Sequence, residues 1–259
     1  MIPYRLYVAL HYYRAPLVNA LSWLFWSREY TNFTYDLEDD NKEYLASFVS
    51  AVTGVSFQQA RSYIAELEGD EALKAHVKKL TSASDQRFTS DGQVRFGERL
   101  GWYALLRAKK PKVVVETGAF NGLGSCVMSS ALMRNEKEGS KGFLYSMDIN
   151  PSAGFLFKEP YSRYGKIIYR SSLDTLRNFS EKIDFFIHDS DHRPEYELQE
   201  YEAVRDSLAP DAMVLSDNSH ATKKLLEFAQ STGRRFLYFQ SKPKDHWYPG
   251  GGIGVAFKK

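Results

Sequence analysis

The feature that most constrains the fold is an alternation of apolar, strand-like runs with helix-like segments, which begins at residue 112. The five strand-like runs are KVVVETG (112–118), GFLYSMDIN (142–150), KIIYRSS (166–172), KIDFFIHDSDH (182–192) and AMVLSDN (212–218). Segments between or after them, such as SCVMSSALMRNEKEG and PEYELQEYEAVRDSLAP, favour helices. Strands that alternate with helices in this way form a mostly parallel sheet with helices on both faces.

The C-terminal tail departs from this alternation. RRFLYFQS (234–241) and GGIGVAFKK (251–259) are both strand-like, and the loop between them, SKPKDHWYPG, fits no helix. Two strands joined by a loop alone pair antiparallel. The sequence therefore predicts an α/β fold, namely a Rossmann-like, doubly wound, mostly parallel seven-stranded sheet with an antiparallel C-terminal hairpin and a helical N-terminal extension.

The residues that precede the sheet favour helices. Apolar positions at helical spacing run through residues 37–81, and the polar, turn-rich stretch SASDQRFTSDGQ (82–93) follows them. We place the domain boundary at this stretch. Residues 1–93 are expected to form a helical extension that serves as a substrate lid or as a dimer or membrane contact, and residues 94–259 to form the α/β domain.

The first 26 residues are rich in aromatic side chains and poor in acids. Arg5, His11 and Arg14 interrupt the apolar run, so it does not resemble a signal peptide. The uninterrupted run APLVNALSWLFW is too short to span a bilayer. We expect a helix that packs on the body or on a second subunit of a homo-oligomer. The alternative is a membrane-surface helix with Arg14, Trp23 and Trp26 at the interface.

Charge and cysteine content exclude two classes of function. Lys and Arg together number 34 and Asp and Glu together number 32, so the chain has no basic field for nucleic acid. A single cysteine, Cys126, rules out an internal disulfide and a Cys-rich zinc site. We interpret Cys126 as a packing residue and expect a reducing, cytoplasmic location.

The first predicted strand runs into a glycine-rich turn. VVVETGAFNGLGS (113–125) places Gly118, Gly122 and Gly124 between a strand and the start of a helix. Glycine has no Cβ, so such a turn lets a ligand approach the backbone at the carboxyl ends of the strands. The pattern alone fits a dinucleotide site, a methyl-donor site or a tight structural turn.

Two acids narrow this choice. Asp148 ends the second strand, where a carboxylate can accept both hydroxyls of a ribose. Nicotinamide dinucleotides and S-adenosylmethionine both carry a ribose. Glu116 precedes the first glycine, where it can meet the amino group of a methionine moiety and would repel a pyrophosphate. Glu116 and the antiparallel hairpin therefore favour S-adenosylmethionine.

The ordered motifs carry a family resemblance. ETGAFNGLGS, MDINP, IDFFIHDSDH and LSDN resemble the motifs of class I S-adenosylmethionine-dependent methyltransferases over about residues 95–259. They are most similar to metal-dependent O-methyltransferases, such as catechol O-methyltransferase and the DSDH-type cephamycin and macrolide-sugar enzymes. The resemblance implies a methyltransferase whose domain 94–259 binds S-adenosylmethionine. The residues predicted to bind this cofactor are Glu116, Gly118, Ala119, Phe120, Asn121, Gly122, Ser125, Asp148, Ile149, Ser172, Asp174 and Asp189.

The acid-rich motifs DSDH and SDN predict a cation site. They follow the fourth and fifth strands, whose ends are neighbours in a parallel sheet, so several carboxylates crowd together at a cost that a cation offsets. Oxygen ligands of this kind suit Mg²⁺ or another divalent cation. The resemblance implies that Asp189, Asp217 and Asn218 are the ligands. Helix capping is the alternative for the set, and Asp191 stays open between the two.

The histidines around these motifs have different expected roles. His192 lies three residues after Asp189, where the relatives carry a catalytic lysine or histidine. The resemblance implies that His192 removes the hydroxyl proton of the acceptor, and a hydrogen-bonded surface histidine is the alternative. We interpret His188 as structural. His220 stays undecided between lining the site and capping a helix.

The sequence thus predicts an enzyme that methylates a hydroxyl of a small molecule, such as a sugar, a phenol or another natural product. An NAD-dependent oxidoreductase and a non-catalytic, donor-binding interaction protein are the alternatives. In the predicted hairpin loop, His246, Trp247 and Tyr248 either wall the substrate or plug the edge of the sheet.

Overall fold

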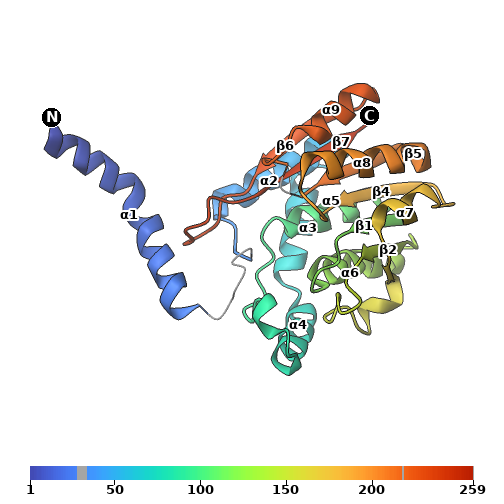
Figure 1. Ribbon diagram of the computed structural model, residues 1–259, viewed down its shortest axis with the longest axis horizontal. Helices are drawn as coiled ribbons and strands as arrows, with labels where there is room; N and C mark the ends of the chain where they lie inside the picture. Colours follow the sequence, from blue (N-terminus) through green and yellow to red (C-terminus); the bar gives the residue numbers. More distant parts are fainter. Residues whose placement is uncertain (28–33, 218, 259) are drawn as a thin grey trace.

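The computed structural model describes residues 1–27, 34–217 and 219–258. A seven-stranded sheet forms its centre, in the order β3-β2-β1-β4-β5-β7-β6 (Figure 1). The strands are β1 (Val113–Thr117), β2 (Phe143–Asp148), β3 (Gly165–Tyr169), β4 (Ile183–His188), β5 (Leu208–Ser216), β6 (Arg235–Gln240) and β7 (Gly252–Phe257). Strands β1 to β5 pair in parallel, and β7 runs antiparallel to both β5 and β6. The predicted fold class and C-terminal hairpin are confirmed.

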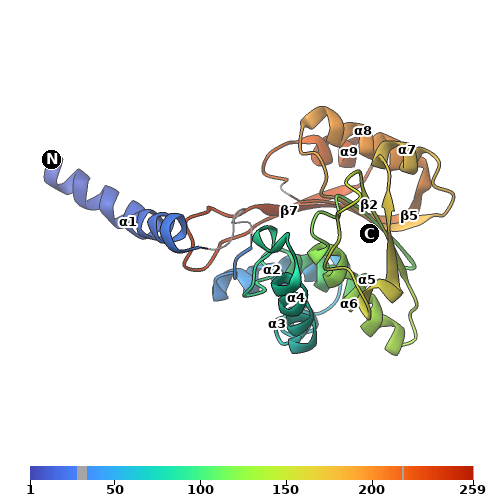
Figure 2. The same cartoon turned by 60° about the horizontal axis from the view of Figure 1, so that its bottom comes forward.

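Helices cover both faces of the sheet (Figure 2). One face carries α7 (Ser172–Arg177), α8 (Pro194–Val204) and α9 (Lys224–Ser231). The other carries α2 (Asp39–Thr53), α3 (Phe57–Glu68), α4 (Glu71–Ala83), α5 (Arg99–Lys109) and α6 (Leu123–Lys137). Successive side chains of a strand point to opposite faces, so Val114 lies in one core and Val115 in the other. This double burial explains the unbroken valine run in β1.

The helices that precede the sheet belong to the same body. Leu45 of α2 and Ile64 of α3 are fully buried in the core that includes Val114 and Val255 of the sheet. Gly101 of α5 lies so close that an added Cβ would come within 2.5 Å of Ile253 Cδ1. Most of the predicted extension therefore packs as a layer of the domain, and its role as a lid or an oligomer contact stays a prediction.

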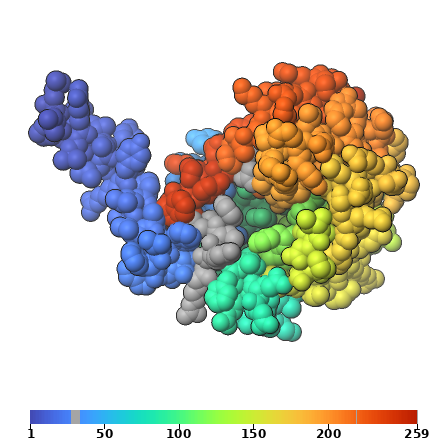
Figure 3. Space-filling model, in the orientation of Figure 1, coloured from blue at the N-terminus to red at the C-terminus, as the bar shows by residue number. Residues whose placement is uncertain are grey.

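Helix α1 (Ile2–Trp26) projects away from this body (Figures 1 and 3). None of its residues is buried. Its ring contact with the body joins Trp23 to Trp247, whose centroids are 5.4 Å apart. We expected this helix to pack on the body or on a second subunit, and its observed contact with the body is slight. Across the described parts of the chain, no helix has both the length and the apolar character needed to cross a membrane.

The strand order positions a ligand site. The chain proceeds from β1 outward through β2 to β3, and then returns to the other side of β1 to form β4 and β5. The connections therefore leave β1 and β4 in opposite directions, which opens a crevice at their carboxyl ends. Thr117 ends β1 and His188 ends β4, so the glycine-rich turn and the DSDH motif meet there.

Candidate active site

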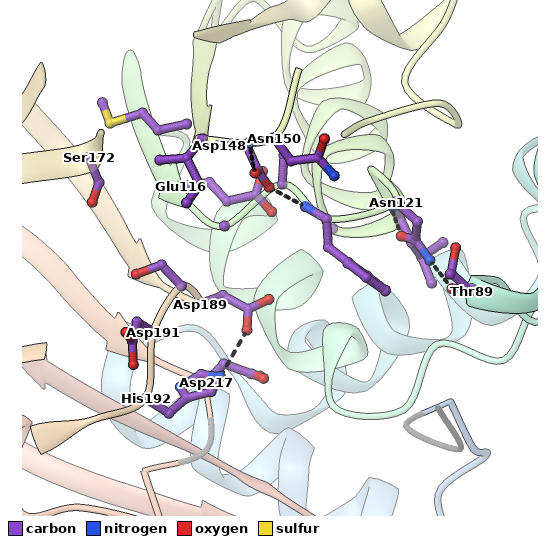
Figure 4. A pocket seen from close by; sticks show the side chains of 18 of the residues that line it. Thr89, Glu116, Asn121, Asp148, Asn150, Ser172, Asp189, Asp191, His192 and Asp217 are labelled. Atoms are coloured by element: carbon purple, nitrogen blue, oxygen red, sulfur yellow. Dashed lines mark hydrogen bonds and ion pairs between the residues drawn. The ribbon is translucent and has the colours of Figure 1, made fainter. Parts of the chain in front are cut away.

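A cavity of about 810 Å³ lies at this crevice (Figure 4). The glycine-rich turn, the end of β2 and the loops after β4 and β5 line it. Thr34 and Tyr35, which precede α2, and Tyr248, from the β6–β7 loop, complete the wall. A cavity of this size can hold a nucleoside-sized ligand together with a small second molecule.

The glycine-rich turn packs closely against the loop after β4, and its predicted approach to a ligand stays a prediction. Gly118 has a φ of +88°, and a Cβ added there would lie 1.9 Å from the backbone oxygen of Asp189. Only glycine fits that position without moving the loop after β4. Asn121 ties the turn to the N-terminal part of the chain, because its Nδ2 donates to the backbone oxygen of Thr89 over 2.8 Å. This hydrogen bond therefore anchors the turn to the segment that precedes α5.

Asp148 holds the turn from the end of β2 (Figure 4). Its Oδ2 accepts a hydrogen bond from the backbone N–H of Phe120 at 2.9 Å, and its Oδ1 accepts one from that of Asn150 at 2.8 Å. The carboxylate is half-buried and lines the cavity. A carboxylate oxygen has room for about two hydrogen bonds, so each oxygen of Asp148 can accept one more from a ligand.

Glu116 lies deeper than an ordinary ligand-binding acid. It is only 1% exposed, and its Oε2 accepts hydrogen bonds from Ser125 Oγ at 2.5 Å and Ser146 Oγ at 2.6 Å. Burial raises the pKa of Glu116 to about 7, although the two hydroxyls favour the ionised form. The carboxyl still lines the cavity, and a cationic group there would restore its charge.

The raised pKa of Glu116 predicts a pH-dependent difference in stability. Because its folded-state pKa lies near 7 and its ordinary value is 4.5, the folded protein loses stability as pH rises from about 4.5 to 7. Glu116→Gln removes this dependence. Its free energy of unfolding, relative to the wild type, should rise by about 3 kcal/mol between pH 4.5 and pH 7.5. Urea denaturation at the two pH values measures it, and a constant difference would contradict the assignment.

The second half of the cavity contains an acid and histidine cluster. Asp189 follows β4, Asp217 follows β5, and His192 lies between them in sequence; one ligand atom of each lies within 4.8 Å of the others. His192 Nε2 is 3.7 Å from Asp189 Oδ1 (Figure 4). Asn218, the third predicted metal ligand, lies outside the described residues. The structure therefore adds His192 to the candidate ligands.

Burial and repulsion between like charges shift the pKa values of the three residues in this cluster. Burial raises the pKa of Asp189 to about 7. Burial and the neighbouring Asp189 carboxyl hold the pKa of Asp217 well above its ordinary range. Burial, followed by the nearby His188 ring, lowers the pKa of His192, which favours the neutral imidazole. A buried and a half-buried carboxyl beside an imidazole are an arrangement that a divalent cation stabilises.

Two charged residues of the site were missed by the sequence analysis. Glu98 and Arg99 begin α5 and line the cavity beside the acid cluster. The guanidinium of Arg99 offsets part of the burial effect on the pKa of Asp189. Their signal in the sequence was a charged pair directly before the apolar run LGWYALL, whose residues are all buried in α5.

His188 is structural, as its alternation with Asp189 predicts. It is fully buried, and its Nδ1 lies 2.6 Å from Oε2 of Glu200. Thr117 and Ser172 also donate hydrogen bonds to Glu200. This buried network fixes the ends of β1 and β4 and the start of α7. Ser172 lines the cavity as well, and its contact with the cofactor stays a prediction.

The remaining residues that were predicted to bind the cofactor fall into two groups, those that line the cavity and those that do not. Ala119, Phe120, Asn121 and Ile149 line the cavity, whereas Gly122, Ser125 and Asp174 do not. Gly122 begins α6 with a φ of +91°, Ser125 is buried behind Glu116, and Asp174 is exposed on α7.

The structure also locates the side chains whose roles the sequence left undecided. Asp191 accepts hydrogen bonds from the side chain and backbone N–H of Arg193, and it stands outside the cation cluster. His220 is exposed and does not line the cavity. Tyr248 contributes to the cavity wall, while Trp247 contacts α1. Cys126 is buried and its Sγ contacts the backbone oxygen of Leu156 at 3.3 Å, in agreement with a packing role.

Comparison with known families decides the class of the domain. Residues 115–219 match the model of a family described as a methyltransferase domain. Residues 115–219 therefore form a methyltransferase domain. The match includes the glycine-rich turn, Asp148 and the acid cluster, and it confirms the predicted resemblance to the class I S-adenosylmethionine-dependent methyltransferases and the prediction of an enzyme. No curated protein matches the sequence.

Solved structures share the fold of this methyltransferase. The cofactor-bound protein Rv0187 from MTB is 16% identical, with a TM-score of 0.57, over 73% of this chain and 90% of its own. The SAM complex of TomG, an O-methyltransferase of tomaymycin synthesis in Streptomyces achromogenes, is 16% identical, with a TM-score of 0.52, over 85% and 98%. The SAH-bound methyltransferase PaMTH1 of Podospora anserina is 13% identical, with a TM-score of 0.52, over 86% and 97%.

Proposed function

We propose that this methyltransferase transfers the methyl group of S-adenosylmethionine to a hydroxyl group of a small molecule, with a divalent cation at the acid cluster. The observation that carries the proposal is the shared cavity, because it joins the Asp148 turn to the Asp189–His192–Asp217 cluster. The O-methyltransferase among the solved structures supports the same acceptor atom.

The donor half of the cavity provides a complementary group for each end of S-adenosylmethionine. Asp148 has two free acceptor positions for the ribose hydroxyls. Glu116 offers a buried carboxylate for the amino group of the methionine moiety, and that ammonium group would lower the raised pKa of Glu116. Gly118 lines the same cavity as these two acids.

The acceptor half fits a divalent cation. Asp189 and Asp217 would hold it, with His192 as a third candidate ligand, because the ligand atoms of the three converge within 4.8 Å and two of the three are carboxylates. Mg²⁺ is the predicted ion, and the imidazole also suits Mn²⁺ or Fe²⁺. A bound cation lowers the pKa of a hydroxyl that coordinates it.

The reaction is an in-line displacement at carbon. The acceptor oxygen forms a bond to the methyl carbon as the carbon–sulfur bond breaks, and the sulfur keeps the electron pair in S-adenosylhomocysteine. The hydroxyl proton goes to a base, for which the neutral His192 is our candidate. The protein aligns oxygen, carbon and sulfur, which lowers the barrier by up to about 7–11 kcal/mol in well-oriented systems.

A role as base and a role as ligand make different predictions for His192, because one nitrogen cannot serve both. If His192 is the base, His192→Gln should lower the rate of methyl transfer at least about a hundredfold and leave Mn²⁺ affinity unchanged. If it is a ligand, Mn²⁺ affinity falls too. Calorimetric titration with Mn²⁺ and transfer of labelled methyl groups distinguish the two. A normal rate in His192→Gln would exclude both roles.

The proposed activity is tested with labelled S-adenosylmethionine and a metabolite extract. Labelled methyl groups should appear in small molecules as base-stable ethers, which are the products of methylation at a hydroxyl, whereas label found only in base-labile esters would indicate a carboxyl acceptor and contradict the proposal. The labelled ethers should disappear in EDTA and return with Mg²⁺. Label found only on nitrogen, carbon or protein would overturn the proposal. A cytoplasmic location and a homo-oligomeric assembly stay predictions.

A further inference from the structure

Helix α1 presents a leucine stripe to solvent. Residues spaced three, four or seven positions apart lie on one face of a helix. Five leucines of α1 share such a face, and each is between 46% and 63% exposed: Leu6, Leu10, Leu17, Leu21 and Leu24. In the described part of the chain, the body buries no residue of this stripe. Its contact with α1 is made by Trp23, which lies about 100° around the helix from Leu24.

The charges of α1 are of one sign. The helix contains Arg5 and Arg14 and no Asp or Glu. Large aromatic side chains are distributed around the helix, on the side of the stripe and on the opposite side, and are 65% to 77% exposed: Tyr4, Tyr7, Tyr12, Tyr13, Phe25 and Trp26. Tyrosine and tryptophan are favoured at the boundary between water and hydrocarbon, because one end of each ring system is polar.

We propose that α1 binds the surface of an anionic lipid membrane, with its leucine stripe in the acyl-chain boundary and its arginines at the headgroups. The apolar stripe, the aromatic residues and the unopposed positive charge all match such a surface. Helix α1 then lies along the membrane and does not cross it, in agreement with the absence of a spanning helix among the described residues.

A second copy of α1 fits the stripe less well. Arg14 lies four residues after Leu10 and three before Leu17, so it flanks the stripe. Paired helices usually place opposite charges beside their apolar seam. Two copies of α1 would bring arginines together with no acid from either helix to pair with them. Anionic headgroups supply that missing charge.

The proposed surface is connected to the active site by aromatic rings. Trp23 of α1 contacts Trp247, and Trp247 lies edge-on to Tyr248 with ring centroids 6.4 Å apart. Tyr248 lines the cavity, as does Tyr35, and their ring centroids are 6.0 Å apart. A membrane bound by α1 therefore lies on the side of the molecule where the β6–β7 loop walls the cavity.

Co-sedimentation of the full chain with vesicles tests this proposal. The wild type should bind vesicles of phosphatidylcholine and phosphatidylserine and bind phosphatidylcholine alone much more weakly. Arg5→Ala with Arg14→Ala should weaken binding to the anionic vesicles about 25-fold, or about fivefold for each charge lost. Leu10→Asp with Leu17→Asp should abolish binding to both.

The control is Tyr44→Asp, which changes an exposed aromatic side chain of α2 and should leave vesicle binding unchanged. All variants should keep their affinity for S-adenosylhomocysteine, since no residue of α1 is buried. This keeps the result separate from the proposed activity. A wild type that stays in solution with anionic vesicles overturns the proposal. So does a dimer that the leucine variant dissociates in the absence of any vesicle binding, because the stripe then binds a second copy.

Discussion

Replacing Asp148 with alanine should reduce the affinity for S-adenosylhomocysteine at least about a hundredfold. The two ribose hydroxyls lose a charged acceptor, and hydrogen bonds to charged groups contribute about 1.5–3 kcal/mol each. The variant also frees the backbone N–H groups of Phe120 and Asn150, which Asp148 now holds. Calorimetric titration with S-adenosylhomocysteine measures the loss.

Asp174→Ala is the matched control for this experiment. Asp174 is another acid that was predicted to bind the cofactor, but it is exposed on α7 and does not line the cavity. Its replacement should leave the affinity unchanged. Equal losses in the two variants would show that the cavity does not place the ribose at Asp148.

Asp217→Asn should weaken Mn²⁺ binding at least about a hundredfold, and methyl transfer should fall with it. Asp217 is one of the two carboxylates of the cluster, and even the loss of a partner beside a metal ligand typically costs 10- to 100-fold in affinity. The folded protein without metal should not be destabilised at neutral pH. Burial and Asp189 hold the pKa of Asp217 well above its ordinary range, so a neutral amide relieves an unfavourable charge.

Asp191→Asn is the control for the cation site. Asp191 belongs to the same DSDH motif, but it pairs with Arg193 outside the cluster. Its replacement should leave Mn²⁺ affinity unchanged. Undiminished Mn²⁺ binding in Asp217→Asn would contradict the proposed ligand set, and chemical denaturation of the metal-free variant would show whether the buried charge is relieved.

The sheet could be predicted from the sequence because its signals are local. The run of valines in β1 requires burial on both faces, and the glycines after it require a close backbone approach, which Gly118 makes. The antiparallel pairing of β6 and β7 followed from the absence of a helix between them. The meeting of Asp189 with Asp217 followed from the parallel order of β4 and β5.

The rest of the site depends on packing between distant segments. Tyr35 and Arg99 reach the cavity because α2 and α5 pack on the sheet, and no local pattern specifies that contact. The orientation of Ser125 also depends on the packing of a helix. The turn predicted a hydroxyl near the donor, but α6 directs it to Glu116. The pairing of Asp191 with Arg193 was likewise visible only in the structure.

The most direct test of the central claim is a calorimetric titration of the wild-type chain with S-adenosylhomocysteine and, separately, with NADH. We predict that S-adenosylhomocysteine binds with one site per chain, that S-adenosylmethionine competes for this site, and that NADH gives no binding heat. Binding of NADH together with no response to S-adenosylhomocysteine would contradict the account.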